Sequence, residues 1–270
     1  MKKPPPIGVI VPTLGTRSDW LAICLRSIIT QSTPTKLVIV GPMKESLVQI
    51  ASEFGAEYIV EEEKGLSLAI NRGWEHLAPD LEFVTWLGDD DILAPSSLEQ
   101  STKALRSHKD AAFSYGRTMY IDSVGAPIYR SYPTRFAPLY LKIGQDYVPQ
   151  PGSLIRVSAV NWYPFLDESL KNAMDLDMFL KLSRKGSKSW IYIPAELSAY
   201  RIHGEAITQT KGAFDESEWV RGRYRGNIAS KVSSMTAIVR KFIEKLYVWS
   251  LWNFPTPNMR QHNYYETGSL

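Results

Sequence analysis

The sequence lacks the features that would assign it to a special class of protein. Cys24 is the only cysteine among 270 residues, so no disulfide can form within the chain and nothing indicates an oxidising compartment. No apolar run approaches the ~20 residues that a membrane span needs, and the lysines and prolines at the start do not form a signal peptide. No repeat or low-complexity tract is visible. We therefore expect a globular, cytoplasmic protein.

The charge balance is also unremarkable. Lys and Arg number 31 against 28 for Asp and Glu, a net charge of +3, which is too small an excess to indicate a nucleic-acid partner. The chain is long enough for one large α/β domain, alone or with an appendage.

Short apolar runs alternate with helical patterns through the first third of the chain. Ile7–Val11 is a β-branched run that is typical of a buried parallel strand. Ser18 is placed to cap a helix in which Leu21, Cys24, Leu25, Ile28 and Ile29 recur at helical spacing. The alternation continues with strands at Leu37–Val40, Tyr58–Val60 and Phe83–Leu87, and with helices at Ser46–Phe54 and Leu66–Leu77. This order predicts a doubly wound, mainly parallel sheet.

The later part of the chain reads as a mixed fold. The patterns predict a helix at Ser97–Ser107, strands within Ala112–Ile121 broken by a turn at Asp122–Pro127, a helix at Asp175–Arg184, a strand at Trp190–Ile193 and an amphipathic helix at Met235–Trp252. No linker is evident, so we expect one main domain, residues 1–212, followed by a helical, basic and aromatic appendage, residues 213–270.

Three carboxylates follow the predicted strand Phe83–Leu87. After Gly88 come Asp89, Asp90 and Asp91, at the carboxyl end of a strand, where α/β sheets bind their ligands. Adjacent carboxylates repel one another, and Mg²⁺ is commonly held by one or two carboxylates together with phosphate oxygens. The cluster therefore suggests a metal and phosphate site, although Asp-rich turns after strands also arise for local structural reasons.

Two ordered blocks of residues resemble the family 2 glycosyltransferases, which are inverting enzymes with the GT-A fold. The first block comprises Val9-Ile10-Val11-Pro12-Thr13, then Leu25, Ser27 and Gln31, then Gly65, Ala69, Asn71 and Gly73, and finally Trp86-Leu87-Gly88-Asp89-Asp90-Asp91. The second comprises Gln150-Pro151 before a strand, Phe165 to Leu170, Met174-Asp175-Leu176-Asp177, and Ala199-Tyr200-Arg201-Ile202-His203. Together they cover about residues 7–208.

The resemblance implies a Rossmann-like catalytic domain that moves a sugar from a nucleotide-diphosphate sugar to a hydroxyl acceptor in polysaccharide, glycolipid or other surface glycan synthesis. Residues 1–110 would then be the nucleotide-sugar-binding half and residues 111–212 the acceptor-binding half. Where similar members have an Asp that contacts the nucleotide base, this chain has Val40-Gly41-Pro42-Met43. UDP, GDP and dTDP sugars therefore all stay open.

The resemblance also implies roles for individual residues. It predicts Mn²⁺ or Mg²⁺ as cofactor, with Asp91 as the best candidate ligand, Asp89 as a second ligand or donor contact, and His203 as a further one. The predicted donor-binding residues are Pro12, Thr13, Arg17, Asn71, Arg72, Asp89, Asp90 and Arg201.

Asp175 occupies the position of the catalytic base in this family. An inverting transfer needs a base to accept the proton of the acceptor hydroxyl. Asp177 is the competitor, and either carboxylate could instead stabilise the first turn of a helix.

The segment from Trp219 to Arg260 is basic and aromatic. It carries eight Lys or Arg residues against one acid, Glu244, beside an apolar helical stripe. This pattern fits an interfacial helix on an anionic membrane or, equally, a helix packed on protein. A peripheral position on the inner face of the cell membrane is thus one expectation.

Two rival functions stay open, a sugar-nucleotide-binding protein without turnover and a nucleotidyltransferase. A nucleotidyltransferase calls for a glycine-rich loop after the first strand, whereas Pro12–Arg17 has one glycine.

Overall fold

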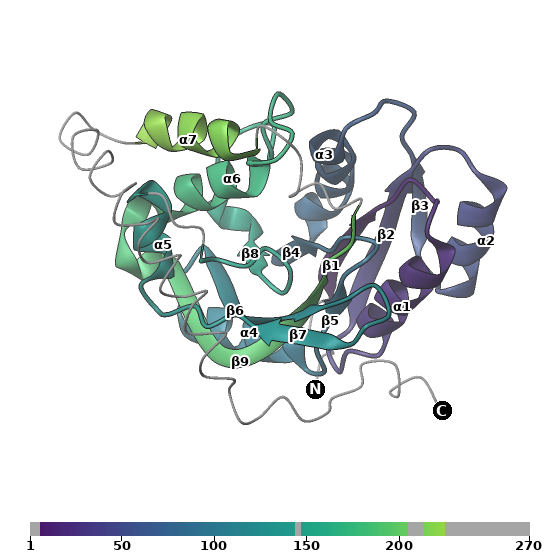
Figure 1. The fold of residues 1–270 in the computed structure, drawn as a ribbon, viewed down its shortest axis with the longest axis horizontal. Helices are drawn as coiled ribbons and strands as arrows, with labels where there is room; N and C mark the ends of the chain where they lie inside the picture. The colour runs from purple at the N-terminus through teal and green to yellow at the C-terminus, as the bar shows by residue number, and fades with distance from the viewer. Residues whose placement is uncertain (1–5, 144–146, 205–212, 225–270) are drawn as a thin grey trace.

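The protein is built on one mixed sheet with helices on both faces. The computed structural model describes residues 6–143, 147–204 and 213–224, and Figure 1 shows their arrangement. The strands follow the order β3-β2-β1-β4-β8-β6-β9-β5, and β7 pairs with β6 outside this path. The predicted α/β class with a mainly parallel, Rossmann-like sheet is confirmed.

The first half of the chain is the regular part of the fold. Its elements are β1 (Ile7–Pro12), α1 (Ser18–Ile29), β2 (Thr35–Gly41), α2 (Glu45–Glu53), β3 (Glu57–Val60), α3 (Leu66–Leu77), η1 (Ala78–Asp80) and β4 (Phe83–Trp86). The strands β3, β2, β1 and β4 are parallel neighbours, so their carboxyl ends meet at one edge of the sheet. Every strand and helix predicted up to residue 87 is present.

The second half adds strands of both directions. It comprises β5 (Ile92–Leu93), α4 (Ser97–Ser107), β6 (Phe113–Ile121), β7 (Pro127–Arg130), α5 (Ala137–Tyr140), η2 (Leu141–Ile143), β8 (Leu154–Arg156), η3 (Val157–Ala159), α6 (Met174–Leu182), η4 (Ser183–Lys185), η5 (Ser187–Ser189), β9 (Trp190–Arg201) and α7 (Ala213–Tyr224). The short β8 pairs antiparallel with both β4 and β6. It therefore joins the parallel half to a second parallel pair, β6 and β9.

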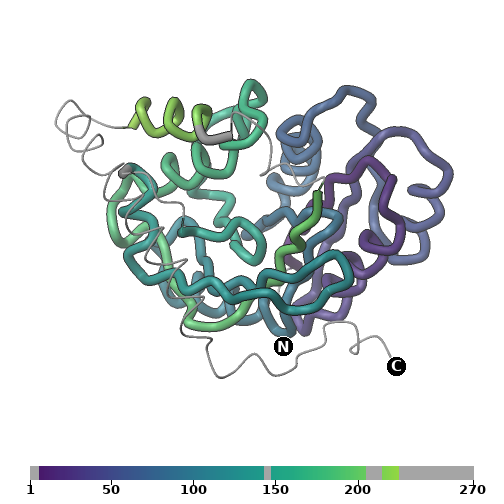
Figure 2. The backbone as a smooth tube through the Cα atoms, viewed as in Figure 1, coloured from purple at the N-terminus to yellow at the C-terminus, as the bar shows by residue number. Residues whose placement is uncertain are grey.

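Two apolar cores hold the layers together. One lies between the sheet and the helices α3, α6 and α7, and includes Ile70, Phe113 and Phe179. The other lies on the opposite face, beneath α1, α2 and α4, and includes Leu25 and Leu105. Cys24 is buried in this second core, as expected for the apolar face of its helix. Figure 2 follows the backbone through both layers.

Some local expectations are wrong. Ser18 does not cap α1, because the helix begins at Ser18 itself and Arg17 occupies the cap position without a side-chain hydrogen bond to the backbone. The strand expected at Trp190–Ile193 continues to Arg201, because its pairing with β6 carries it through Pro194 and Glu196 with two shifts of register.

The remaining expectations concern the carboxyl-terminal part. The boundary proposed at residue 212 and the helix proposed at Met235–Trp252 lie outside the described residues. In the part of the chain that the structure describes, no helix is long and apolar enough to cross a membrane.

Ser27 and Gln31, two residues of the first motif block, bind the segment that follows the carboxylate cluster. The hydroxyl of Ser27 accepts a hydrogen bond from the backbone N–H of Leu93 at 3.0 Å. The amide of Gln31 donates to the carbonyl of Ala94 at 3.0 Å and accepts from the N–H of Leu98 at 3.2 Å. These contacts tie α1 to the segment from β5 to the start of α4, which directly follows the carboxylate cluster in the chain.

Candidate active site

The three carboxylates lie in a tight turn at the carboxyl end of β4. The N–H of Asp91 donates to the carbonyl of Gly88 at 3.1 Å. A Cβ at Gly88 would lie only 2.7 Å from Oδ1 of Asp90 and 3.1 Å from Oδ2 of Asp91. The carboxylates therefore fold back over the backbone of Gly88, and a side chain there would have to displace them. The turn sends the three side chains towards different partners.

Asp89 faces the loop after β1. Its Oδ2 accepts a hydrogen bond from the hydroxyl of Thr13 at 2.5 Å, and its Oδ1 accepts one from Nη2 of Arg17 at 2.9 Å. The carboxylate is buried, and burial raises its pKa, as does the neighbouring Asp90, while Thr13 and Arg17 act in the opposite direction. Asp89 is therefore a connector between the ends of β1 and β4.

Asp90 faces the end of β9. Its Oδ2 lies 3.1 Å from Nη1 of Arg17 and 2.8 Å from Nε2 of His203. The same Nη1 lies 3.2 Å from His203 Nε2, so the three groups form a closed triangle. Residues predicted from three separate motifs therefore meet at one point.

Asp91 points inward. Its Oδ1 accepts the backbone N–H of Arg201 at 3.1 Å, and no described residue donates to its Oδ2. Burial raises the pKa of this carboxyl well above its usual range, and the charge on Asp90 adds to the effect. A buried carboxylate with an uncommitted oxygen favours a nearby cation.

Arg201 is almost fully buried, at 1% exposure. Its Nε donates to the backbone carbonyl of Asp90 at 3.0 Å, and its Nη1 donates to the carbonyls of Asp122 and Ser123. Its observed contacts therefore hold the β4 turn against the β6–β7 hairpin. A role in donor binding stays a prediction.

Trp20 is a member of the site that the sequence did not reveal. Its ring lies 5.0 Å from Cζ of Arg201 and 5.7 Å from Cζ of Arg17, and its centroid is 4.9 Å from that of His203. Arg17, Trp20 and Cys24 recur at intervals of three and four, so one helix face carries them. That spacing was the available signal.

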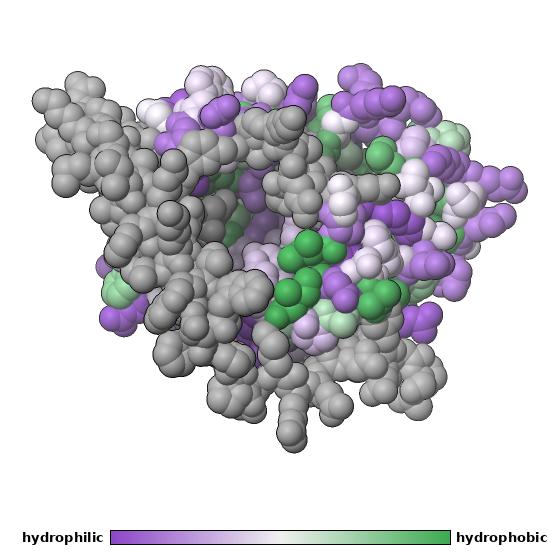
Figure 3. All heavy atoms as spheres, viewed as in Figure 1, coloured by the Kyte–Doolittle hydropathy of each residue, from purple (hydrophilic) through white to green (hydrophobic). Residues whose placement is uncertain are grey.

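The site lies on the face shown in the figures. The green end of β9 runs beside the purple segment after β1 in Figures 1 and 2, as the contact between His203 and Arg17 requires. The space-filling view of this face shows a hollow near its centre with hydrophilic residues on its floor (Figure 3).

Asp175 and Asp177 both occur in the first turn of α6 but have different environments. Asp177 is 1% exposed; it accepts from the hydroxyl of Tyr224 at 2.5 Å and pairs with Lys181 at 2.8 Å. Asp175 is only partly buried. Its Oδ1 accepts the N–H of Leu176 at 2.8 Å, and no described residue donates to its Oδ2. Asp175 thus has the carboxylate available for chemistry.

Burial raises the pKa of Asp175, with hydrogen bonds from the backbone and the charge of Arg221 opposing the rise. A raised pKa makes a carboxylate a stronger base. No hydrogen bond or ion pair joins Asp175 to the carboxylate cluster among the described residues.

Glu216 of α7 supports the segment that leads into α6. Its carboxylate accepts the backbone N–H groups of Lys171, Asn172 and Ala173 at 2.9, 2.6 and 2.9 Å. These donors would otherwise be unpaired at the helix start. Burial opposes ionisation of Glu216, but the three N–H groups hold its pKa below the usual range. No local pattern indicates this role, because 43 to 45 residues separate the partners.

Three further predicted donor residues lie near the first strands. Asn71 is buried: its Nδ2 donates to the carbonyl of Leu166 and to Glu168, and its Oδ1 accepts the N–H of Leu166. Arg72 donates to Glu61 at 2.9 Å. Pro12 ends β1 and is buried. Their contacts with a donor stay predictions.

The backbone at Gly41, within the departure at residues 40–43, has no room for a side chain. A Cβ at Gly41 would lie 2.3 Å from the backbone carbonyl oxygen of Thr13. The end of β2 approaches the loop after β1 so closely that no side chain fits there. An acidic residue at position 41 is therefore excluded by the packing of this chain.

Comparison with known proteins identifies the family. Residues 8–162 match the model of Glycosyl transferase family 2, which is more than half of the chain. The protein belongs to glycosyl transferase family 2. No curated protein matches the chain.

Solved structures agree on the fold of this family 2 member. The crystal structure of TarS from S. aureus matches with a TM-score of 0.56 and 15% identity, covering 73% of this chain and 37% of TarS. TarS 1–349 in complex with UDP-GlcNAc matches with a TM-score of 0.56 and 15% identity, covering 76% of this chain and 61% of that one. The complex of TarS 1–349 with UDP gives 0.56 and 14%, covering 73% and 60%. The chain thus spans less than two thirds of these proteins, and identities this low show the fold alone.

The side chains of the site fit a divalent cation whose other ligands are phosphate oxygens. In the described part of the chain no three His, Cys, Asp or Glu side chains form a group that could hold a metal alone. Adjacent ligands of an octahedral ion with bonds of about 2.1 Å lie about 3 Å apart, close to the 2.8 Å between His203 Nε2 and Asp90 Oδ2. Mg²⁺ is usually held by one or two carboxylates together with phosphate oxygens and water, so Asp90 fits this pattern and His203 would be an additional ligand.

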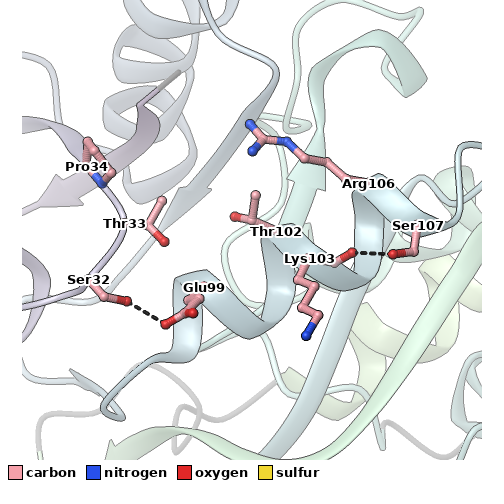
Figure 4. Close-up of a pocket in the computed structure, with 8 residues that line it drawn as sticks. All are labelled: Ser32, Thr33, Pro34, Glu99, Thr102, Lys103, Arg106 and Ser107. Atoms are coloured by element: carbon pink, nitrogen blue, oxygen red, sulfur yellow. Dashed lines mark hydrogen bonds between the residues drawn. The ribbon is translucent and has the colours of Figure 1, made fainter. Parts of the chain in front are cut away.

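The two cavities found elsewhere contain none of these residues. The larger, of about 550 Å³, is an open depression between Ser32–Pro34 and α4. In Figure 4 its lining groups bond to one another, Ser32 to Glu99 at 2.7 Å and Ser107 to the carbonyl of Lys103 at 2.9 Å. A second, of about 380 Å³, lies beside Trp162 and Lys181. Neither resembles the predicted site.

Proposed function

We propose that this family 2 protein is an inverting glycosyltransferase that moves a sugar from a nucleoside diphosphate sugar to a hydroxyl of a glycan or lipid-linked acceptor. The observation that carries the proposal is the meeting of Arg17, Asp90 and His203, which come from the ends of β1, β4 and β9. This combination of carboxylate, imidazole and guanidinium suits a metal-bound diphosphate. Surface polysaccharide or glycolipid synthesis is the setting we infer.

The donor diphosphate would lie over the turn that carries Asp89, Asp90 and Asp91. TarS has been crystallised with UDP and with UDP-GlcNAc, so a UDP sugar is the first donor to test on this chain. GDP and dTDP sugars belong in the same experiment, because Gly41 leaves no side chain at the point where similar members contact the base.

Mn²⁺ or Mg²⁺ would neutralise the charge that develops on the leaving diphosphate. Asp90 and His203 are the best oriented ligands, since their atoms already face each other at 2.8 Å. Asp91 and Asp89 stay candidates, Asp91 through its Oδ2 and Asp89 only if Thr13 or Arg17 releases it. Thr13 and Arg17 lie on the same side of the cluster and are the nearest donors of hydrogen bonds.

Asp175 would act as the base. The acceptor oxygen attacks the anomeric carbon and forms the new C–O bond, its proton passes to Oδ2 of Asp175, and the old C–O bond breaks with its electron pair leaving on the nucleoside diphosphate. Attack opposite to the leaving group inverts the anomeric centre. Asp177 is a poor alternative, because Tyr224 and Lys181 already engage its oxygens.

A transfer assay with a panel of UDP, GDP and dTDP sugars tests the proposal. Nucleotide release is measured with Mn²⁺, with Mg²⁺ and with a chelator, and the anomeric configuration of the product is read by NMR. We expect the nucleoside diphosphate to be released from the sugars of one nucleotide class. The release should require Mn²⁺ or Mg²⁺, and the product should have the inverted anomeric configuration. Tight nucleotide binding without release would instead identify a sugar-nucleotide-binding protein, and release of pyrophosphate from a nucleoside triphosphate would identify a nucleotidyltransferase.

We also propose that the basic, aromatic segment after α7 contacts an anionic membrane, which would place the enzyme on the inner face of the cell membrane beside a lipid-linked acceptor. The support is compositional: six basic residues stand against one acid, Glu244, between the end of α7 and Arg260. Deleting residues 233–270 should lower co-sedimentation with anionic liposomes. Unchanged co-sedimentation would exclude the segment as an anchor.

A further inference from the structure

Arg17 occupies the place where a cation would meet the carboxylates. Its Nη2 lies 2.9 Å from Asp89 and its Nη1 lies 3.1 Å from Asp90. One guanidinium therefore bridges two adjacent acids from outside the turn. The side chain is 26% exposed, so it has a path to solvent.

The contacts of this guanidinium are not those of a fully satisfied ion pair. Nε of Arg17 is buried and makes no hydrogen bond with any described residue. Buried donors are normally paired. The bridge to the acids therefore leaves one of the hydrogen-bonding groups of Arg17 unused.

The triangle around His203 contains a conflict. Nε2 lies 2.8 Å from Oδ2 of Asp90 and 3.2 Å from Nη1 of Arg17. If Nε2 carries a proton it can donate to Asp90 but opposes the N–H groups of Arg17; if it does not, it accepts from Arg17 but faces the lone pairs of Asp90. One imidazole nitrogen cannot satisfy both neighbours, whereas a metal ion in place of Arg17 would accept electron pairs from Asp90 and His203 alike.

Charge balance points the same way. Two guanidinium groups, those of Arg17 and Arg201, lie beside the turn that carries the three negatively charged carboxylates. Arg201 is bound to backbone carbonyls and is buried, whereas the described hydrogen bonds of the Arg17 guanidinium go to the acids and His203. If Arg17 departs, the carboxylates lose its positive charge, which a divalent ion would replace.

We propose that Arg17 is the counter-cation of the donor-free site and that donor binding moves its guanidinium from Asp89 and Asp90 to the diphosphate. This inference rests on the proposed function. In it, the incoming nucleoside diphosphate draws Arg17 away through charge-assisted hydrogen bonds. The divalent ion then meets Asp90 and His203. Metal binding is therefore conditional on the nucleotide, and Arg17 is a positioning residue that enforces the order.

Mn²⁺ binding measured by electron paramagnetic resonance tests this order without any turnover. Wild type is titrated with Mn²⁺ alone and with Mn²⁺ plus UDP, GDP or dTDP, and compared with Arg17→Ala, Arg17→Lys and Arg26→Ala. Arg26 is exposed on the same helix, so Arg26→Ala removes the same charge away from the carboxylates. We expect wild type and Arg26→Ala to bind Mn²⁺ only with a nucleoside diphosphate.

Arg17→Ala should bind Mn²⁺ without nucleotide, at least about tenfold more tightly than wild type, because a neighbouring positive charge has been removed. Arg17→Lys keeps the charge and should stay close to wild type, which separates the charge of Arg17 from any loss of folding. Nucleotide binding without metal should weaken in Arg17→Ala but not in Arg26→Ala.

Two results would overturn the inference alone: tight Mn²⁺ binding to wild type without nucleotide, or no gain in Arg17→Ala while wild type still binds Mn²⁺ with nucleotide. If wild type binds no Mn²⁺ even with nucleotides, the metal-dependent function proposed above fails together with it.

Discussion

Nε2 of His203 lies 2.8 Å from Oδ2 of Asp90, although 113 residues separate the two in the chain. The contact joins the end of β9 to the turn after β4 and fixes one edge of the candidate donor site. The three adjacent acids thus have different partners: Asp90 contacts His203, whereas Asp89 contacts Thr13 and Asp91 contacts the backbone of Arg201.

His203→Gln tests this contact. Glutamine can keep a hydrogen bond to Asp90 but is a poorer ligand than imidazole. We expect the apparent affinity for Mn²⁺ in the presence of nucleotide to fall by about tenfold or more, which is the loss typical even for residues that support a metal site. His108→Gln is the control, because His108 is exposed at the end of α4. An unchanged Mn²⁺ titration in His203→Gln would remove His203 from the metal site.

Asp175 gives a prediction about pH. Because its pKa in the folded protein is raised by burial, the base is ionised only at a higher pH than an ordinary Asp, and transfer should fall on the acid side through that raised pKa. The same shift means that the folded state binds more protons than the unfolded state between the two pKa values. Asp175 therefore destabilises the fold above its raised pKa, and this penalty disappears as the pH falls towards the unfolded value.

Asp175→Asn should accordingly abolish transfer and yet increase the free energy of unfolding at neutral pH, by about 0.5–1 kcal/mol. Thermal unfolding of both proteins at several pH values checks the effect, and the difference should shrink in acid. A less stable Asp175→Asn at neutral pH, or one with normal transfer, would contradict the assignment.

Glu216 should matter for catalysis through the segment that it holds in front of α6. Glu216→Ala leaves three backbone N–H groups without their acceptor, so we expect a loss of about 1–3 kcal/mol in stability and a fall in kcat larger than any rise in the donor KM. Glu216→Gln should recover part of both. Asp215→Asn, an exposed acid beside it, is the matched control. Equal losses in Glu216→Ala and Asp215→Asn would deny Glu216 a specific role.

The regular half of the fold could be predicted because three of its strands, β1, β2 and β4, are largely buried on both faces. Runs such as Ile7–Val11 have only one stable location in an α/β protein, and the bounds of α3 and α4 match the predicted ranges. The full length of β9 could not be predicted. Its continuation past Ile193 depends on pairing with β6, and Pro194 and Glu196 break the apolar pattern that would have revealed it.

The sequence indicated which residues follow the strand β4 but not which partner each of them faces. Sequence places Asp89, Asp90 and Asp91 at the end of a strand, but which carboxylate faces His203 depends on the turn at Gly88 and on contacts from β1 and β9. Asn71 illustrates the same limit, since its position in a motif does not reveal that its amide binds the backbone of Leu166. Glu216 acts through tertiary contacts that no local pattern encodes, whereas the helical spacing of Trp20 from Arg17 and Cys24 was a signal that could have indicated its place.

Calorimetric titration of nucleoside diphosphates tests the central claim most directly. UDP, GDP and dTDP are titrated, with Mn²⁺ present, into wild type, Asp90→Asn and the surface control Asp110→Asn. The account predicts one-to-one binding of at least one nucleotide to wild type and Asp110→Asn, and a loss of about tenfold or more in affinity in Asp90→Asn. Equal affinity in all three proteins, or no binding of any nucleotide to wild type, would contradict the claim that the diphosphate lies at this carboxylate cluster.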